Sequence, residues 1–202
     1  MTCIPITIPN LLSSFRILLV PVLVWLAHQQ QEAWFLLLLT VALATDALDG
    51  YLARKLSQAS DLGAKLDSWG DSLTYGAMVL ALIWLWPDIM ERERSYVFIG
   101  MSCYLLPTLM GLLKFRELPS FHTWSAKASA VAMVPAYYLM VIADESLLFR
   151  AVVLFDIWVA AEAVLITAML RRNRNNVASV FHAREIVRRQ AARLREKISR
   201  TP

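Results

Sequence analysis

The chain has 202 residues, of which 58% are hydrophobic, and its mean hydropathy is +0.51. Soluble globular domains are only about 45–50% apolar, so this composition excludes an ordinary soluble domain and favours a compact membrane domain. The formal net charge of +4 is unevenly spread, because ten of the 20 basic residues lie in residues 171–202. The two cysteines, Cys3 and Cys103, are too few and too isolated to suggest a disulfide framework or a zinc site.

Apolar windows of about 18–20 residues predict transmembrane helices along the chain. Six such segments are separated by short polar connectors, one of which covers residues 87–94. The expected helices are 11–27, 35–54, 61–86, 96–113, 124–142 and 148–170. The chain is therefore predicted to be an all-α integral membrane protein, with six transmembrane helices in one bundle.

The basic residues predict the orientation of these helices. If the N-terminus is cytoplasmic, 17 of the 20 Lys and Arg residues lie on the cytoplasmic side, and only Arg92, Arg94 and Arg150 lie outside. We therefore expect a membrane domain over residues 1–170, a basic tail over residues 171–202, and both termini in the cytoplasm. An Arg-rich tail can bind nucleic acid, but after a membrane domain anionic lipid headgroups are its expected partner.

Four aspartates stand at helical spacing inside the predicted second and third helices. Positions i, i+3, i+4 and i+7 form one stripe on the second helix, and these are Asp46, Asp49, Gly50 and Ala53. Positions i, i+4 and i+8 form a stripe on the third helix, and these are Gly63, Asp67 and Asp71. Because the connector between the two helices is short, the stripes are expected to face each other near the cytoplasmic side.

Carboxylates at such positions are costly and need a compensating partner. Oxygen ligands suit Mg²⁺, Mn²⁺ or Ca²⁺ rather than zinc, and two divalent ions would balance four ionised aspartates. Two such ions fit phosphoryl-transfer chemistry. Small residues in the stripes leave room for a ligand to approach, and these are Gly50, Ala53 and Gly63. Arg54 is placed to meet a phosphate at the cytoplasmic mouth.

Together these residues read D-x2-D-G-x2-A-R-x8-G-x3-D-x3-D over residues 46–71, which we call the signature. The signature resembles that of the CDP-alcohol phosphatidyltransferase family at every fixed position. The number and placement of the predicted helices extend the resemblance over about residues 5–170.

The resemblance implies a homodimeric six-helix enzyme of the bacterial inner membrane, with its active site facing the cytoplasm. Such an enzyme transfers the phosphatidyl group of CDP-diacylglycerol to an alcohol and releases CMP. By position, two divalent ions would be bound by Asp46, Asp49, Asp67 and Asp71. Asp71 would also be the general base. The cytidine diphosphate would be held by Asp49, Gly50, Ala53, Arg54 and Gly63.

The acceptor alcohol is less well defined by the residues. The segment of residues 8–12, followed by Arg16 and Pro21, is similar to the N-terminus of bacterial phosphatidylglycerophosphate synthases. The order Leu-Asp-Ser-x-x-Asp over residues 66–71 is more similar to serine- and choline-type members. Glycerol 3-phosphate is the expected acceptor, and serine, inositol or its phosphate, choline and phosphatidylglycerol are the alternatives.

Three further charged residues are candidates for a role. Lys127, at the cytoplasmic start of the fifth helix, either contacts an acceptor phosphate or extends to the membrane interface. Asp156 and Glu162 lie inside the sixth helix, where an ionisable residue is a functional hypothesis. Their spacing predicts that they point to different faces, with Asp156 hydrogen-bonded to another helix and Glu162 near the acceptor.

Other readings of the aspartates are a structural polar patch, an ion-translocation path in a divalent-cation transporter, and a membrane prenyltransferase. The fixed spacing of the signature argues against a simple polar patch. A transporter is expected to have paired, interrupted helices in its two halves, and a prenyltransferase two separated Asp-rich motifs. The sequence shows neither pattern.

Overall fold

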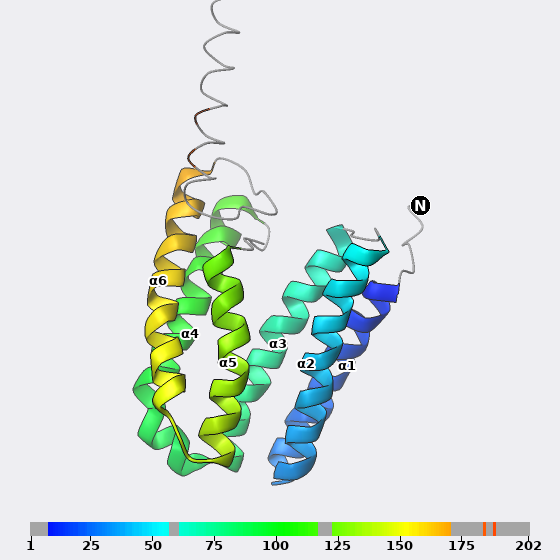
Figure 1. The fold of residues 1–202 in the computed structure, drawn as a ribbon, viewed down its shortest axis with the longest axis vertical. Helices are drawn as coiled ribbons and strands as arrows, with labels where there is room; N and C mark the ends of the chain where they lie inside the picture. Colours follow the sequence, from blue (N-terminus) through cyan, green and yellow to red (C-terminus); the bar gives the residue numbers. More distant parts are fainter. Residues whose placement is uncertain (1–7, 57–60, 117–122, 171–183, 185–187, 189–202) are drawn as a thin grey trace, which may run out of the picture. The chain divides into compact units, whose positions relative to one another are not determined.

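The computed structural model describes residues 8–56, 61–116 and 123–170, together with Arg184 and Arg188 of the tail. Within these residues the chain forms six α-helices and no strand, which confirms the predicted all-α fold (Figure 1). The helices are α1 Ile8–His28, α2 Glu32–Lys55, α3 Asp61–Leu85, α4 Pro87–Phe115, α5 Trp124–Ile142 and α6 Leu147–Met169. The remainder of the tail lies outside the described residues.

The fourth helix begins earlier than predicted. Residues 87–94 are not a polar connector but the first turns of α4. Proline is favoured at the first helical position because the amide hydrogen that it lacks would have no partner there, and Pro87 occupies that position. Asp88 in the first turn also interacts favourably with the helix dipole. The other helices agree with the predicted segments to within a few residues.

Five of the described helices are long and apolar enough to cross a membrane, which makes this a membrane protein. They are α1, α2, α4, α5 and α6. The first half of α3 carries four charged residues, Asp61, Lys65, Asp67 and Asp71, which explains why α3 does not have a fully apolar stretch of that length. A membrane crossing by α3 stays a prediction.

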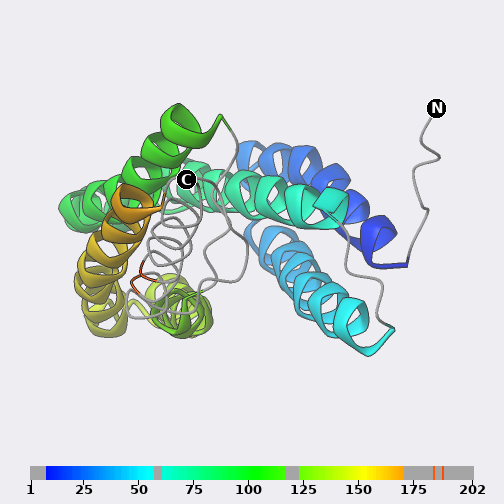
Figure 2. The ribbon, with the colours of Figure 1, turned by 90° about the horizontal axis from the view of Figure 1, so that it is seen from above.

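The chain forms two compact units, and the first covers Met1–Glu91. In it, α1 packs against both α2 and α3 (Figures 1 and 2). Small side chains allow helices to pack closely where lipid surrounds them, and four alanines are buried in this unit: Ala27, Ala42, Ala77 and Ala81. Near the α1–α2 turn, Trp86 donates a hydrogen bond of 3.2 Å to Glu32 Oε1.

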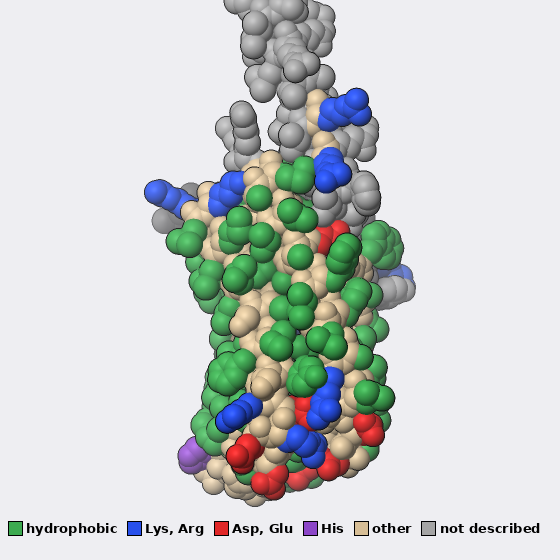
Figure 3. All heavy atoms as spheres, turned by 90° about the vertical axis from the view of Figure 1, so that its left-hand side faces the viewer, with side chains coloured by type: hydrophobic (Ala, Val, Ile, Leu, Met, Phe, Trp, Pro, Cys, Tyr) green, Lys and Arg blue, Asp and Glu red, His purple; other side chains and the backbone are tan. Residues whose placement is uncertain are grey.

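The second unit covers Arg92–Pro202, and in it α5 packs against α6. At one end of this unit, Lys114 Nζ donates hydrogen bonds of 2.8 Å to the carbonyls of Thr167 and Ala168. At the other end, Arg150 on α6 forms an ion pair of 2.7 Å with Glu93 on α4. Figure 3 shows hydrophobic side chains over the middle of the face in view, most of the acidic side chains at its lower end, and basic side chains at both ends.

Candidate active site

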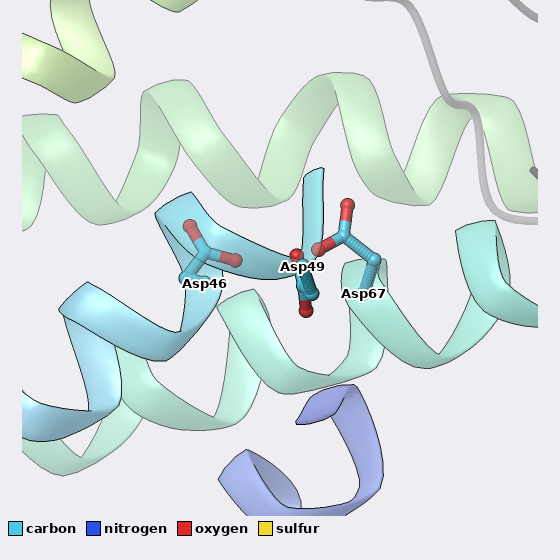
Figure 4. A group of neighbouring side chains, drawn as sticks. All are labelled: Asp46, Asp49 and Asp67. Atoms are coloured by element: carbon cyan, nitrogen blue, oxygen red, sulfur yellow. The ribbon is translucent and has the colours of Figure 1, made fainter. Parts of the chain in front are cut away.

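Carboxylates from two helices of the first unit meet at one place (Figure 4). Asp46 and Asp49 come from α2 and Asp67 comes from α3, and one oxygen of each lies within 4.8 Å of the others. Asp49 is only 5% exposed, whereas Asp46 and Asp67 are half-buried. The helical spacing explains why Asp46 and Asp49 lie together, because residues three apart share one face of α2.

The fourth aspartate of the signature, Asp71, lies one turn further along α3 than Asp67. It is outside the group of three, and its side chain is 54% exposed. Its Oδ1 nevertheless lies 3.4 Å from Nη2 of Arg16, the same nitrogen that is 3.1 Å from Asp67 Oδ1. Asp71 therefore borders the cluster on a more accessible side. We call Asp46, Asp49, Asp67 and Asp71 the aspartate cluster.

A basic side chain from α1 lies among these acids. Arg16 is only 1% exposed, and its guanidinium forms ion pairs with three of the four aspartates: Asp46, Asp67 and Asp71. The same guanidinium donates a hydrogen bond of 3.0 Å to the backbone carbonyl of Asp67. The site is thus formed by three helices, whereas the sequence pattern predicted two.

Two further residues shape the site around this arginine. Ser13, one turn before Arg16 on α1, donates a hydrogen bond of 2.8 Å to Asp49 Oδ2. Gly70 on α3 lies directly against the guanidinium, because a Cβ at this position would be 2.6 Å from Arg16 Nε and 2.7 Å from Nη2. Such distances are far below van der Waals contact, so a side chain at position 70 would displace Arg16.

The donor set fits a hard divalent cation. Carboxylate oxygens are the ligands that Mg²⁺ and Mn²⁺ prefer, and three of them already lie close enough to share one ion. The place also accommodates a positive charge, since the Arg16 guanidinium is held there by the same carboxylates. The cluster could therefore hold a divalent ion, and the four ligand assignments stay predictions.

The structure describes the surroundings of two of the other four signature residues. Gly50 on α2 and Gly63 on α3 are half-buried in the helices that carry the aspartates. Ala53 and Arg54 continue α2, but their side chains lie outside the described part of the structure. The predicted contacts of these residues with a cytidine diphosphate stay predictions.

The predicted acceptor residue Lys127 lies in the second unit, in the first turn of α5. It is exposed, and its Nζ is 5.4 Å from the centre of the Trp124 ring, which is a cation–π distance. Thr123 caps this helix by accepting a hydrogen bond of 3.2 Å from the amide of Ala126. Lys127 thus contacts an aromatic ring of its own helix, and its contact with an acceptor stays a prediction.

Asp156 and Glu162 on α6 both contact α5. The predicted bond of Asp156 to another helix is confirmed, and the place of Glu162 near the acceptor stays a prediction. Ser129 donates a hydrogen bond to Asp156, as expected for a residue bonded to another helix, and Ser125 donates one to Glu162. The two serines are one turn apart on α5. Both carboxylates thus have partners between α5 and α6.

Arg16, Ser13 and Gly70 lie at the aspartate cluster, although the sequence pattern did not place them there. From the sequence, Arg16 was noted only because it belongs to the segment that resembles the N-terminus of phosphatidylglycerophosphate synthases. The signal that could have identified it is an arginine inside an otherwise apolar helix, which needs an acidic partner. Nothing in the sequence indicates that the partners are the signature aspartates, 30 or more residues away.

Comparison with known proteins extends the resemblance beyond the signature. The sequence model of the CDP-alcohol phosphatidyltransferase family matches residues 6–171. No solved structure gives a significant match.

Individual relatives carry two kinds of name. The chain is similar to a cardiolipin synthase (CMP-forming) of Streptomyces coelicolor, with 31% identity over 148 residues, or 70% of this chain and 67% of that protein. A CDP-diacylglycerol–glycerol-3-phosphate 3-phosphatidyltransferase of Pseudomonas fluorescens is 37% identical over 139 residues, covering 66% and 71%. A protein of the same name from Cereibacter sphaeroides is 40% identical over 142 residues, covering 63% and 62%. Since the family model covers most of the chain, this protein belongs to the CDP-alcohol phosphatidyltransferase family.

Proposed function

We propose that this protein transfers the phosphatidyl group of CDP-diacylglycerol to glycerol 3-phosphate and releases CMP. The observation that carries the proposal is the convergence of the signature aspartates of α2 and α3 at one place. Family membership supports the reaction class. The relatives named as glycerol-3-phosphate 3-phosphatidyltransferases support the acceptor.

The proposed chemistry assigns two roles to the aspartate cluster. Bound Mg²⁺ or Mn²⁺ would neutralise the diphosphate and stabilise the charge on the leaving CMP. Asp46, Asp49, Asp67 and Asp71 are the proposed ligands of two such ions. Asp71 is the proposed base that takes the proton of the acceptor hydroxyl, because a hydroxyl is a weak nucleophile without one. Its exposed side chain suits a base that must reach a second substrate.

The remaining signature residues are proposed to hold the donor. Gly50, Ala53 and Gly63 would let the cytidine diphosphate approach the two helices closely, and Arg54 would pair with its phosphates. Lys127 is the proposed contact for the phosphate of the acceptor. We further propose that both termini and the active site face the cytoplasm of a bacterial inner membrane, that the enzyme is a homodimer, and that residues 171–202 form a basic tail after the membrane domain.

The proposal is tested by incubating the purified protein with Mn²⁺ or Mg²⁺, CDP-diacylglycerol and a panel of radiolabelled alcohols, while CMP release is followed. We expect CMP release that depends on glycerol 3-phosphate. If no alcohol in the panel supports CMP release, the proposed reaction is wrong. Divalent-metal uptake into vesicles without CMP release would favour a transporter instead.

Asp71→Asn tests the proposed base in the same assay. We expect turnover to fall by at least about 100-fold while binding of the CDP-lipid largely remains, since general bases contribute rate factors of that size. Asp88→Asn is the matched control, because Asp88 is exposed at the start of α4. A near-normal rate in Asp71→Asn would remove this residue as the base.

Phosphatidylglycerol is the second candidate acceptor. It is favoured by the similarity to the cardiolipin synthase of Streptomyces coelicolor. The two acceptors are separated by the same panel, because phosphatidylglycerol would yield a labelled product with four acyl chains, whereas glycerol 3-phosphate would yield one with two. Product analysis by thin-layer chromatography therefore decides between them.

A further inference from the structure

We propose that Arg16 is a built-in counter-cation of the aspartate cluster, which divalent ions must displace, and that it thereby sets the metal affinity of the enzyme. The inference rests on the proposed function, because it assumes that the cluster binds divalent ions. It adds a residue of α1, outside the signature, that regulates the proposed site. Arg16 is a positioning residue in this proposal and does not take part in the chemistry.

The positive charge of Arg16 lies among the proposed metal ligands. The Arg16 guanidinium is almost completely buried, and it pairs with Asp46 on α2 and with Asp67 and Asp71 on α3. The carboxylate oxygens that it contacts belong to three of the four proposed metal ligands. Carboxylates this close together repel each other unless a cation lies between them. In the structure that cation is the guanidinium.

The guanidinium and a divalent ion compete for the same carboxylate oxygens. A divalent ion lies about 2.0–2.6 Å from its oxygen ligands. An ion on the oxygens that Arg16 contacts would therefore lie only a few ångströms from the guanidinium, and two cations at that distance repel. Metal binding must then move Arg16 away from these carboxylates, which lowers the affinity for the metal.

The hydrogen bonding of Arg16 differs from that of a purely structural link between helices. A buried structural arginine normally has all its donors paired. Within the described residues, Arg16 Nε is buried without a hydrogen-bond acceptor. The guanidinium contacts the carboxylates of the aspartate cluster and the backbone carbonyl of Asp67.

Gly70 offers a steric test that leaves every charge in place. A methyl group at position 70 would lie 2.6 Å from Arg16 Nε, 2.7 Å from Nη2 and 3.0 Å from Cζ, so Gly70→Ala must displace the guanidinium. Gly76 is the matched control on the same helix, because a Cβ there meets nothing within 4 Å. If Arg16 competes with metal, Gly70→Ala and Arg16→Gln should act in the same direction.

The experiment measures Mn²⁺ binding to the metal-free protein in detergent by electron paramagnetic resonance, without lipid substrate, together with the thermal midpoint with and without Mn²⁺. We expect Arg16→Gln to bind Mn²⁺ about tenfold more tightly, in the range usual for coupled sites. Its midpoint should be lower than that of the wild type without metal and should rise more when Mn²⁺ is added. Gly70→Ala should show the same changes more weakly. Arg16→Lys keeps the charge, so its Mn²⁺ affinity should stay closer to that of the wild type. The control Gly76→Ala should have the same Mn²⁺ affinity as the wild type.

Equal or weaker Mn²⁺ binding by both Arg16→Gln and Gly70→Ala would overturn the inference and leave Arg16 as a link between helices. If Arg16→Gln fails to fold, Gly70→Ala alone decides, since it retains the arginine. Failure of the proposed function has a different signature: the wild type itself would neither bind Mn²⁺ nor release CMP. A wild type that binds Mn²⁺ and turns over, with variants of unchanged affinity, would refute only the role of Arg16.

Discussion

Individual side chains of α1 complete a site whose acids come from α2 and α3. Arg16 compensates the charge of the aspartate cluster, and Ser13 orients Asp49 through a hydrogen bond of 2.8 Å. Both residues of this hydrogen bond are buried, at 3% and 5% exposure. A buried carboxylate with a fixed hydrogen bond presents its other oxygen in a defined direction, which favours a metal ligand.

We predict that Ser13→Ala weakens Mn²⁺ binding by about tenfold, the lower end of the effect of residues that orient metal ligands. The loss should occur without a change in the charge of the cluster, because serine is neutral. Titration of the metal-free protein with Mn²⁺ measures it. Ser102→Ala is the control, since in the described part of the chain that exposed hydroxyl bonds to the carbonyl of Phe98 within its own helix. Unchanged affinity in Ser13→Ala would show that Asp49 is oriented by other contacts.

At the scale of elements, polar contacts connect the apolar helices of the second unit. Serines of α5 bond to the acids of α6, and Glu93 on α4 is fully buried between two arginines. Arg150 contacts both Glu93 oxygens at 2.7 and 2.8 Å, and Arg92 Nε lies 3.1 Å from Glu93 Oε1. These contacts hold the start of α4 against the start of α6. This first part of α4 is the segment that was predicted to be a connector.

Glu93→Gln should destabilise the protein by about 3 kcal/mol. This is the low end of the range for breaking a buried ion pair, and we expect the low end because Arg150 is partly exposed to water. The physical reason is the loss of the only acid that both arginines share at this position in the described structure. Unfolding in detergent, followed by circular dichroism, measures the change. Glu91→Gln, an exposed residue of the same helix, should change the stability by less than about 0.5 kcal/mol. Equal stabilities of the two variants would contradict this role of Glu93.

At the scale of the whole molecule, the orientation in the membrane is predicted from the distribution of Lys and Arg residues. The proposed cytoplasmic site requires the start of α3 and the end of α2 to lie on the same side as the N-terminus and the tail. The α1–α2 turn, around residues 29–31, would then lie on the outer side. Short connections join α1 to α2, α3 to α4 and α5 to α6, as such an alternation of sides requires.

The orientation predicts which positions react with a membrane-impermeant maleimide in spheroplasts. In a Cys3→Ser, Cys103→Ser background, Gln29→Cys should be labelled directly, because Gln29 is exposed in the α1–α2 connection. Arg184→Cys, in the tail, should be labelled only after the membrane is permeabilised. The reverse pattern would place the active site on the outer side of the membrane.

The sequence alone determined the all-α fold, the helix positions and the family. These depend on local properties: apolar length predicts a membrane helix, and spacing of three or four residues places Asp46 beside Asp49 and Asp67 beside Asp71. Even the exception is local, because the early start of α4 follows from the position of Pro87, which the sequence analysis weighed as a connector residue.

Only the tertiary structure decided which other residues meet the aspartates. Arg16, Ser13 and Gly70 reach the cluster because α1 packs against both α2 and α3, and the periodicity of one helix carries no information about the angle at which another approaches. The same holds for Asp156 and Glu162, whose partners on α5 depend on how two helices face each other. Long-range packing, rather than local spacing, therefore placed a cation beside the proposed metal ligands.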